Sequence, residues 1–150
     1  YPCLYYQYLA CATRIVEAKQ TVELGADIGV SALMLASETD GKVYSVDNRE
    51  CWSLVPDEHP NIVKYLGDST TLTLYKGIDL QKTDVWLIDS DHSGPRFEKE
   101  CQTYRPFWKK GAVVIADDVD QYRNAWDILE GDRLYIPRDI HGNGVGVLIV

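Results

Sequence analysis

One stretch of the sequence, residues 22–31, most constrains what this chain can fold into. It reads VELGADIGVS, and the apolar, β-prone residues 20–24 that lead into its first glycine predict a buried strand. Gly25 and Gly29 allow a tight turn and a close approach of the backbone to a ligand. Apolar residues recur at helical spacing after Gly29, so the free amides of that helix face the carboxyl end of the strand. The stretch predicts the ligand crevice of an open α/β sheet, although any tight strand-to-helix turn uses similar glycines.

The glycine spacing differs from that of dinucleotide-binding domains. Those domains use G-x-G-x-x-G, whereas three residues separate Gly25 from Gly29 here and an acid, Glu23, precedes the turn. A carboxylate at this place repels a pyrophosphate and attracts an amino group or another positive charge. The pattern disfavours an NAD-binding domain and favours a ligand with a cationic group.

Composition restricts the classes of partner. The 150 residues contain 15 Lys and Arg against 23 Asp and Glu, a formal net charge of −8. Nucleic-acid-binding domains present basic faces, so we expect no nucleic-acid partner. No apolar run is as long as a membrane span, and the four cysteines lack metal-binding spacing. We expect one soluble, cytoplasmic domain over residues 1–150 that acts on a small molecule away from membranes. Because it starts at Tyr1, we also expect sequence before it.

Hydrophobic periodicity predicts alternating strands and helices. Strands are expected at residues 20–24, 43–46, 61–66, 84–88, 112–116, 133–137 and 145–150. Helices are expected at 2–18, after Gly29, at 51–59, at 70–80, after Pro95 and at 121–129. In the first helix, the face predicted to pack on the sheet consists of Leu4, Tyr8, Cys11 and Ile15. The last two strands are joined by a short loop and must be antiparallel, which gives the sheet one reversed strand.

Acidic residues follow the predicted strands in a regular way. They stand at successive strand ends: Glu23, Asp47, Asp68, Asp89 with Asp91, and Asp117 with Asp118. Because the carboxyl ends of parallel strands share one edge of a sheet, we expect these carboxylates on one rim. Their repulsion requires a cation, hydroxyl or amino groups, or water in compensation. Asp47 lies about twenty residues beyond the glycine turn, where an acid can bind a ribose diol; helix capping is the alternative.

Five motifs in this order resemble class I S-adenosylmethionine-dependent methyltransferases, in the branch of small-molecule O-methyltransferases that includes catechol-type enzymes. The motifs are VELG and GVS within 22–31, VYSVD at 43–47, GDS at 67–69, LIDSDHS at 87–93 and GAVVIADDV at 111–119. The resemblance covers essentially the whole chain. Each motif is weak alone, and the combination is specific.

The resemblance implies an α/β fold with a Rossmann-like, seven-stranded, mostly parallel sheet, an antiparallel last strand and helices on both faces. It also implies a site for S-adenosylmethionine. The residues expected around its methionine part are Glu23, Gly25, Gly29 and Ser31. Asp47 is expected at the ribose, Asp68 and Ser69 near the adenine, and Asp89 beside the methionine amino group and the methyl-transfer zone. The predicted cofactor site is completed by Ala26, Asn48 and Gly67.

In the metal-dependent members of this branch, the positions that match Asp89, Asp117 and Asp118 hold one divalent cation. Three carboxylates suit Mg²⁺ or Ca²⁺, which would orient an acceptor hydroxyl and lower its pKa. The alternative is that Asp117 and Asp118 only cap a turn and that the site is free of metal.

His92 and Asp89 are the predicted catalytic residues. Imidazole titrates near neutral pH, so His92 is the best candidate for a general base beside the methyl-transfer zone. A structural ring bonded to Asp91 or to backbone is the alternative. His141, between the last two strands, is a weaker second candidate, and His59 is expected at the surface.

Two departures from the family pattern bear on function. Asp27 stands where many relatives have a second glycine, and its carboxylate is expected to crowd that of the cofactor. The chain also has no room for the segments that usually cap the acceptor pocket. There are three alternatives. The cap lies in sequence before Tyr1, a partner subunit in a homo-oligomer supplies it, or the site is open and binds a large substrate. We predict methyl transfer from S-adenosylmethionine to a hydroxyl oxygen of a small molecule, with a non-catalytic cofactor-binding or interaction domain as the alternative.

Overall fold

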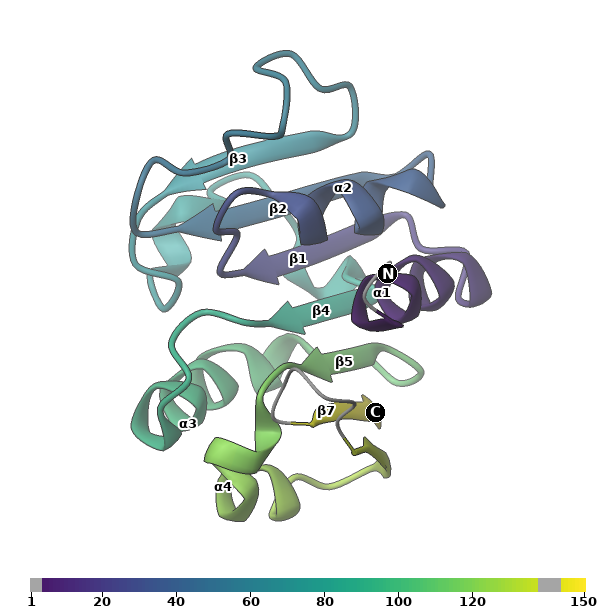
Figure 1. Cartoon of the computed structure of the whole chain (residues 1–150), viewed down its shortest axis with the longest axis vertical. Helices are drawn as coiled ribbons and strands as arrows, with labels where there is room; N and C mark the ends of the chain where they lie inside the picture. The colour runs from purple at the N-terminus through teal and green to yellow at the C-terminus, as the bar shows by residue number, and fades with distance from the viewer. Residues whose placement is uncertain (1–3, 138–143) are drawn as a thin grey trace.

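Seven strands form one sheet in the computed structural model, which describes residues 4–137 and 144–150. The strand order is β3-β2-β1-β4-β5-β7-β6 (Figure 1). The strands are β1 Gln20–Leu24, β2 Lys42–Asp47, β3 Ile62–Leu66, β4 Val85–Ile88, β5 Val113–Ala116, β6 Asp132–Ile136 and β7 Val145–Ile149. β7 runs antiparallel to both of its neighbours, β5 and β6, whereas β1 to β5 are parallel. The prediction of one reversed strand is confirmed.

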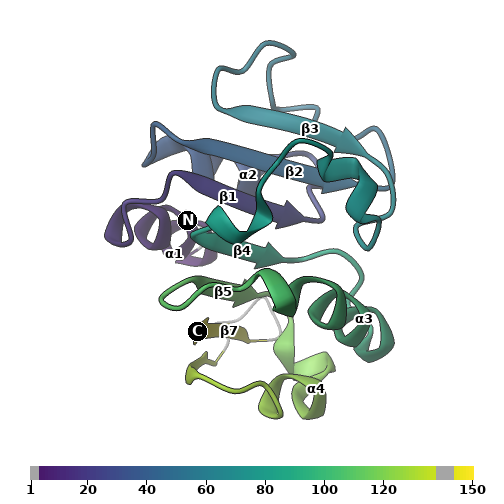
Figure 2. The same cartoon turned by 180° about the vertical axis from the view of Figure 1, so that it is seen from behind.

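Helices cover both faces of the sheet, as predicted. α1 (Leu4–Ile15) and α2 (Val30–Ser37) pack on one face, toward the viewer in Figure 1. α3 (Gly94–Tyr104) and α4 (Arg123–Asp127) pack on the other face, which Figure 2 shows from behind. Four short 3-10 helices, η1 Leu72–Tyr75, η2 Leu80–Lys82, η3 Arg105–Phe107 and η4 Val119–Gln121, lie between these elements. Within the described residues, no helix is long and apolar enough to cross a membrane.

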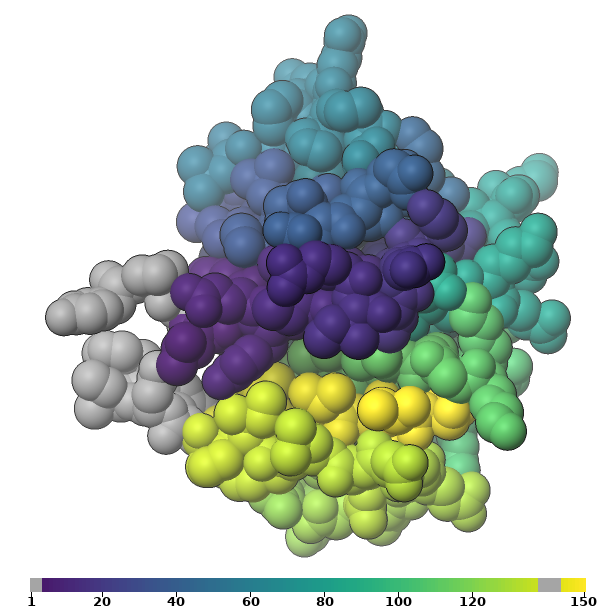
Figure 3. All heavy atoms as spheres, turned by 90° about the vertical axis from the view of Figure 1, so that its right-hand side faces the viewer, coloured from purple at the N-terminus to yellow at the C-terminus, as the bar shows by residue number. Residues whose placement is uncertain are grey.

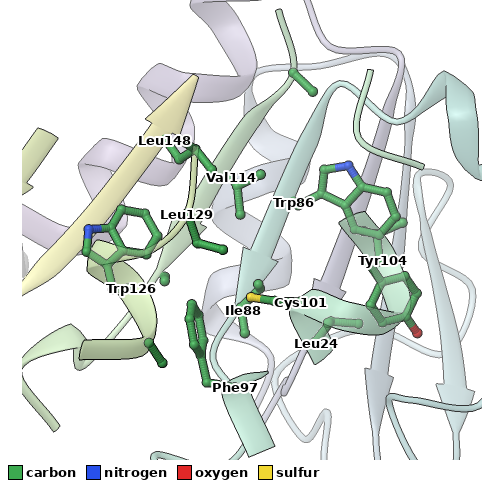
Figure 4. Packing of buried hydrophobic residues seen from close by; sticks show 14 of the residues in the cluster. Leu24, Trp86, Ile88, Phe97, Cys101, Tyr104, Val114, Trp126, Leu129 and Leu148 are labelled. Carbon is green, nitrogen blue, oxygen red and sulfur yellow. The ribbon is translucent and has the colours of Figure 1, made fainter. Parts of the chain in front are cut away.

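The larger core lies between the sheet and α3 and α4. All four residues of β4 are buried, because a central parallel strand is covered on both faces. Trp86 of β4 packs against Tyr104 of α3, with 5.2 Å between their ring centroids (Figure 4). Nearer the sheet edge, Trp126 lies beside Leu148 and Leu129. This packing fixes α3 behind the strand ends that carry the predicted site.

The prediction of the buried face of α1 is wrong. Its buried residues are Leu9, Ala10 and Thr13, whereas Ile15 is 76% exposed. Small Ala10 lets the helix approach the sheet, and the hydroxyl of buried Thr13 donates to the carbonyl of Ala10 (2.9 Å). Because this hydroxyl is satisfied within its own helix, Thr13 can be buried at little cost. The spacing of apolar residues therefore predicts the face of α1 opposite to the one that packs on the sheet.

Two predicted helices do not form. Residues 51–59 make turns, since Trp52 and Val55 place their side chains in the core beneath α2. The amide of Leu54 donates to the carbonyl of Ile28 (3.0 Å), which ties this segment to the β1–α2 turn. Residues 70–80 contain η1 and the start of η2 in place of one α-helix. Gly77 between them has φ +90°, a left-handed conformation that ends a right-handed helix.

Candidate active site

A cavity of about 530 Å³ opens at the carboxyl ends of the parallel strands. Its wall comes from the β1–α2 turn, the ends of β2, β4 and β5, helix α1 and the last two strands. The predicted site residues that line it are Gly25, Ala26, Ser31, Asp47, Asp89, His92, Asp117 and Asp118. The structure thus brings together residues that are far apart in the sequence, at the crevice expected for an open α/β sheet.

Gly25 brings the β1–α2 turn against the end of β4. Its φ is +92°, and a Cβ there would lie 2.0 Å from the carbonyl oxygen of Asp89. The amide of Gly25 donates to the carbonyl of Val46 (2.8 Å), so the turn is also held by β2. Gly29, with φ +89°, caps the first turn of α2, but it packs toward Val55 and does not line the cavity. Only a residue without a side chain fits at Gly25.

Asp47 is an anion held by backbone amides. Its Oδ2 accepts from the amides of Ala26 (3.0 Å) and Asp27 (3.2 Å), and its Oδ1 accepts from the amide of Arg49 (2.9 Å). Burial alone would raise the pKa of Asp47, yet these amides hold it below its ordinary value. The carboxylate faces both the cavity and the neighbouring hollow. A carboxylate is an acceptor only, so one that faces these hollows suits a ligand with hydroxyl groups.

Glu23 does not reach the cavity surface. It is fully buried in β1, where its Oε2 accepts from the hydroxyl of Ser45. Trp52 in turn donates its indole N–H to Ser45 (2.8 Å). Burial raises the pKa of Glu23 to about 7, although the nearby hydroxyls act in the opposite direction. The predicted contact of Glu23 with the methionine part stays a prediction, whereas Ser31 of α2 lies in the cavity wall.

A second hollow of about 450 Å³ continues the first. The two share Gly25, Asp47, Arg49, Ser90 and His92. The predicted residues Asn48 and Ser69 line it, together with Arg96 of α3. Gly67 and Asp68 do not line it. Asp68 instead accepts from Arg96 (2.9 Å), whose guanidinium holds the pKa of that carboxyl well below its usual range.

Glu100, which the sequence analysis did not single out, holds three residues that line the second hollow. This α3 side chain is fully buried, and its Oε1 accepts from the hydroxyls of Ser69 and Ser90 and from Nε of Arg96 (3.2 Å). Burial raises the pKa of Glu100, against the effect of these donors. Glu100 thereby joins the loops that follow β3 and β4. The available signal was an acid four residues after Arg96, next to the apolar stripe of α3.

His92 and Asp118 form a pair in the cavity wall. Nδ1 of His92 lies 3.1 Å from Oδ2 of Asp118, and the side-chain amide Nε2 of Gln121 donates to the same oxygen (2.9 Å). The His92 side chain is 44% exposed, against 17% for Asp118. Asp118 has φ +55°, an uncommon conformation for a residue with a side chain. With Nδ1 directed at the carboxylate, Nε2 is the nitrogen left to accept a proton.

Asp89 and Asp117 complete the acidic end of the cavity. The hydroxyl of Tyr5 in α1 donates to Oδ2 of Asp89 (3.0 Å). Burial, followed by the negative charge of Asp117, raises the pKa of Asp89 well above its ordinary value. His141, the second candidate base, lies outside the described residues.

The three carboxylates predicted to hold a cation line one cavity but do not converge as metal ligands. Oxygens of Asp89 and Asp118 are engaged by Tyr5, Gln121 and His92. Across residues 4–137 and 144–150, no group of three His, Cys, Asp or Glu side chains is arranged to hold an ion. The geometry therefore does not fit the predicted Mg²⁺ or Ca²⁺ site.

The fold and the cavity together indicate the class of protein to which this chain belongs. The seven-stranded, mostly parallel sheet with β7 reversed, and helices on both faces, are what the resemblance to class I S-adenosylmethionine-dependent methyltransferases implies. A family described as a methyltransferase domain matches residues 22–119. The chain belongs to this family. A comparison with curated proteins finds no match.

Solved structures of methyltransferases share the fold. One is a Staphylococcus aureus protein provisionally assigned as a caffeoyl-CoA O-methyltransferase, with a TM-score of 0.78 and 16% identity over 99% of this chain and 84% of that one. A Bacillus cereus O-methyltransferase in complex with SAH has a TM-score of 0.76 and 16% identity, over 100% and 82%. TomG of Streptomyces achromogenes, an O-methyltransferase of tomaymycin synthesis in complex with SAM, has a TM-score of 0.77 and 12% identity, over 100% and 81%.

Proposed function

We propose that this chain, as one methyltransferase domain over residues 1–150, transfers a methyl group from S-adenosylmethionine to a hydroxyl oxygen of a small molecule. The observation that carries the proposal is the His92–Asp118 pair, which lies in the same cavity as the amide-held carboxylate of Asp47. Asp47 would accept from the ribose, and His92, which lines the same cavity, would remove a proton. The structures of similar fold that contain SAM and SAH support the choice of cofactor.

The cavity and the adjoining hollow suit the shape of S-adenosylmethionine. This ligand is long and carries an amino acid at one end and a nucleoside at the other. Asp47 would accept hydrogen bonds from the ribose hydroxyls, and the hollow beside Asn48 and Ser69 would hold the adenine. Asp89 would lie beside the methionine ammonium, whose positive charge would favour the ionised carboxylate against the effect of burial. The chemistry that the cofactor supplies is an electrophilic methyl group on a positively charged sulfur.

His92 would act as the general base. Nδ1 faces Asp118, so Nε2 would accept the proton of the acceptor hydroxyl as its oxygen attacks the methyl carbon. Asp118 would then stabilise the imidazolium through the Nδ1–H bond. The proton ends on His92, the methyl group on the acceptor oxygen, and the bonding electrons on sulfur. No step of this proposal runs through a metal ion.

Calorimetric titration tests the cofactor assignment first. S-adenosylmethionine and S-adenosylhomocysteine are each expected to bind with micromolar dissociation constants, in Mg²⁺ and in chelator. Absence of binding by either would overturn the assignment. Binding without methyl transfer to any hydroxyl acceptor would instead favour a non-catalytic binding domain.

Transfer of radiolabelled methyl to a panel of phenols, hydroxy acids and sugars tests the reaction. With the best acceptor, His92→Gln is expected to lower kcat at least about 100-fold and to leave cofactor affinity within about twofold, because the base acts on the acceptor. The matched control is His59→Gln. Nδ1 of His59 accepts from the amide of Asn61 (3.2 Å), and the residue lines neither hollow. Full activity of His92→Gln would remove His92 as the base.

A further inference from the structure

Helix α1 contributes a side chain to the acidic end of the cavity. Tyr5 donates to Asp89 across 84 residues of sequence, and α1 lies before the matched family region at 22–119. In Figure 3, α1 (purple) crosses this face of the molecule between α2 (blue) and the last strands (yellow). The helix therefore packs on the sheet and also reaches the end of β4.

The backbone of Asp89 is fixed from two sides. Its amide donates to the carbonyl of Leu24 (2.8 Å), and its own carbonyl lies where a Cβ of Gly25 would otherwise stand. Rotation of the side chain is the freedom that remains. Three carboxylates act on that side chain through their charge, those of Asp117, Glu23 and Asp118. The hydroxyl of Tyr5 holds one oxygen, Oδ2, at 3.0 Å.

We propose that Tyr5 is a positioning residue for cofactor binding. It fixes Oδ2 of Asp89 and leaves Oδ1 to accept from the methionine ammonium of S-adenosylmethionine. The 3.0 Å bond from the Tyr5 hydroxyl limits rotation of this carboxyl group, so Oδ1 keeps one direction. The proposal rests on the proposed function, because it needs the methionine part of the cofactor to lie beside Asp89.

The rival explanation is that Tyr5 only shapes the cavity wall. Its ring lies 5.3 Å from that of Tyr6, and both line the cavity. A purely steric role depends on the ring, whereas the positioning role depends on the hydroxyl. Tyr5→Phe separates the two roles because it removes one oxygen and keeps the ring.

The test is calorimetry on Tyr5→Phe with three probes: S-adenosylmethionine, S-adenosylhomocysteine and 5′-methylthioadenosine, which lacks the amino-acid part. We expect the first two to bind about tenfold more weakly than to the parent chain, the scale of one hydrogen bond to a charged group. The affinity for 5′-methylthioadenosine should stay unchanged. General damage to the site would weaken all three probes equally and would overturn the proposal.

Tyr135→Phe is the matched control. Its hydroxyl also donates to a carboxylate, that of Asp120 (2.7 Å), and the residue lines neither hollow. We expect parental affinity for all three probes. If the parent binds S-adenosylmethionine and Tyr5→Phe binds it equally well, the positioning role fails and the proposed function stands. If the parent binds none of the probes, both fail.

Discussion

Replacement of Glu23 by Gln should change how the stability of this protein depends on pH. Glu23 is fully buried in β1, and burial raises its pKa from 4.5 to about 7. Gln has nearly the same shape and cannot ionise. Its carbonyl can still accept from Ser45, whose hydroxyl bonds Glu23 in the parent. The substitution therefore removes a titration and keeps most of the packing.

The sign follows from proton binding. Between pH 4.5 and about 7 the folded chain keeps the proton on Glu23, whereas the unfolded chain releases it. The stabilisation is complete below about pH 4.5 and is lost as the pH rises through about 7. At about 1.4 kcal/mol per pH unit, this window corresponds to about 3 kcal/mol of unfolding free energy. Over the same pH range, the unfolding free energy of Glu23→Gln should therefore fall by about 3 kcal/mol less than that of the parent.

Urea unfolding followed by tryptophan fluorescence measures the effect. Trp52, Trp86 and Trp126 are buried and will report the loss of the core. The observable is the fall in unfolding free energy from about pH 5 to about pH 8, compared between the parent and Glu23→Gln. Titrating groups that do not interact with Glu23 cancel in this comparison, whereas Asp47 and Asp89 feel its charge. Glu98→Gln, an exposed change on α3, is the control and should follow the parent. Equal falls in the parent and Glu23→Gln would refute the reasoning.

Four further substitutions follow from the site. Asp47→Ala should weaken S-adenosylmethionine binding at least about tenfold in calorimetry. It removes the proposed ribose acceptor and leaves three backbone amides without the carboxylate that they bond. Gly25→Ala should lower the melting temperature by more than about 10 °C, since its Cβ would overlap the backbone of Asp89. Glu100→Ala should cost about 3 kcal/mol in urea unfolding, because it removes the acceptor of the Ser69 and Ser90 hydroxyls and of Nε of Arg96. Asp27→Gly should raise stability by about 1 kcal/mol, because it relieves a φ of +43°; an unchanged or lower stability would count against strain at this position.

Much of the fold could be predicted because local pattern and tertiary structure agree. β1 runs over Gln20–Leu24 as predicted, and the other strand ends lie within about one residue of prediction. The reversed β7 followed from a short loop, which geometry allows only between antiparallel strands. Of the acids that follow strands, Asp47, Asp89, Asp117 and Asp118 line the cavity, whereas Glu23 is buried in β1 and Asp68 accepts from Arg96.

The predictions are wrong or incomplete where tertiary contacts outweigh the periodicity of apolar residues. α1 buries Thr13 because the hydroxyl is satisfied inside its own helix, and residues 51–59 stay irregular because Trp52 and Val55 are drawn into the core. Glu100 was not predicted because a buried acid is rare, and because the hydroxyls that donate to it, those of Ser69 and Ser90, come from two other loops. A sequence pattern carries no record of such long-range donors.

The acids at the strand ends differ in the direction of their pKa shifts. Asp47 is stabilised as an anion by three amides, and Asp68 by the guanidinium of Arg96. Glu23 and Asp89 instead have raised pKa values, because burial and neighbouring carboxylates favour the proton. The hydrogen-bond donors near each carboxyl group determine the direction of its pKa shift, and strand topology does not determine which donors are near. A row of acids in the sequence therefore predicts where a cationic ligand can dock, whereas the surrounding donors decide which carboxylates meet it as anions.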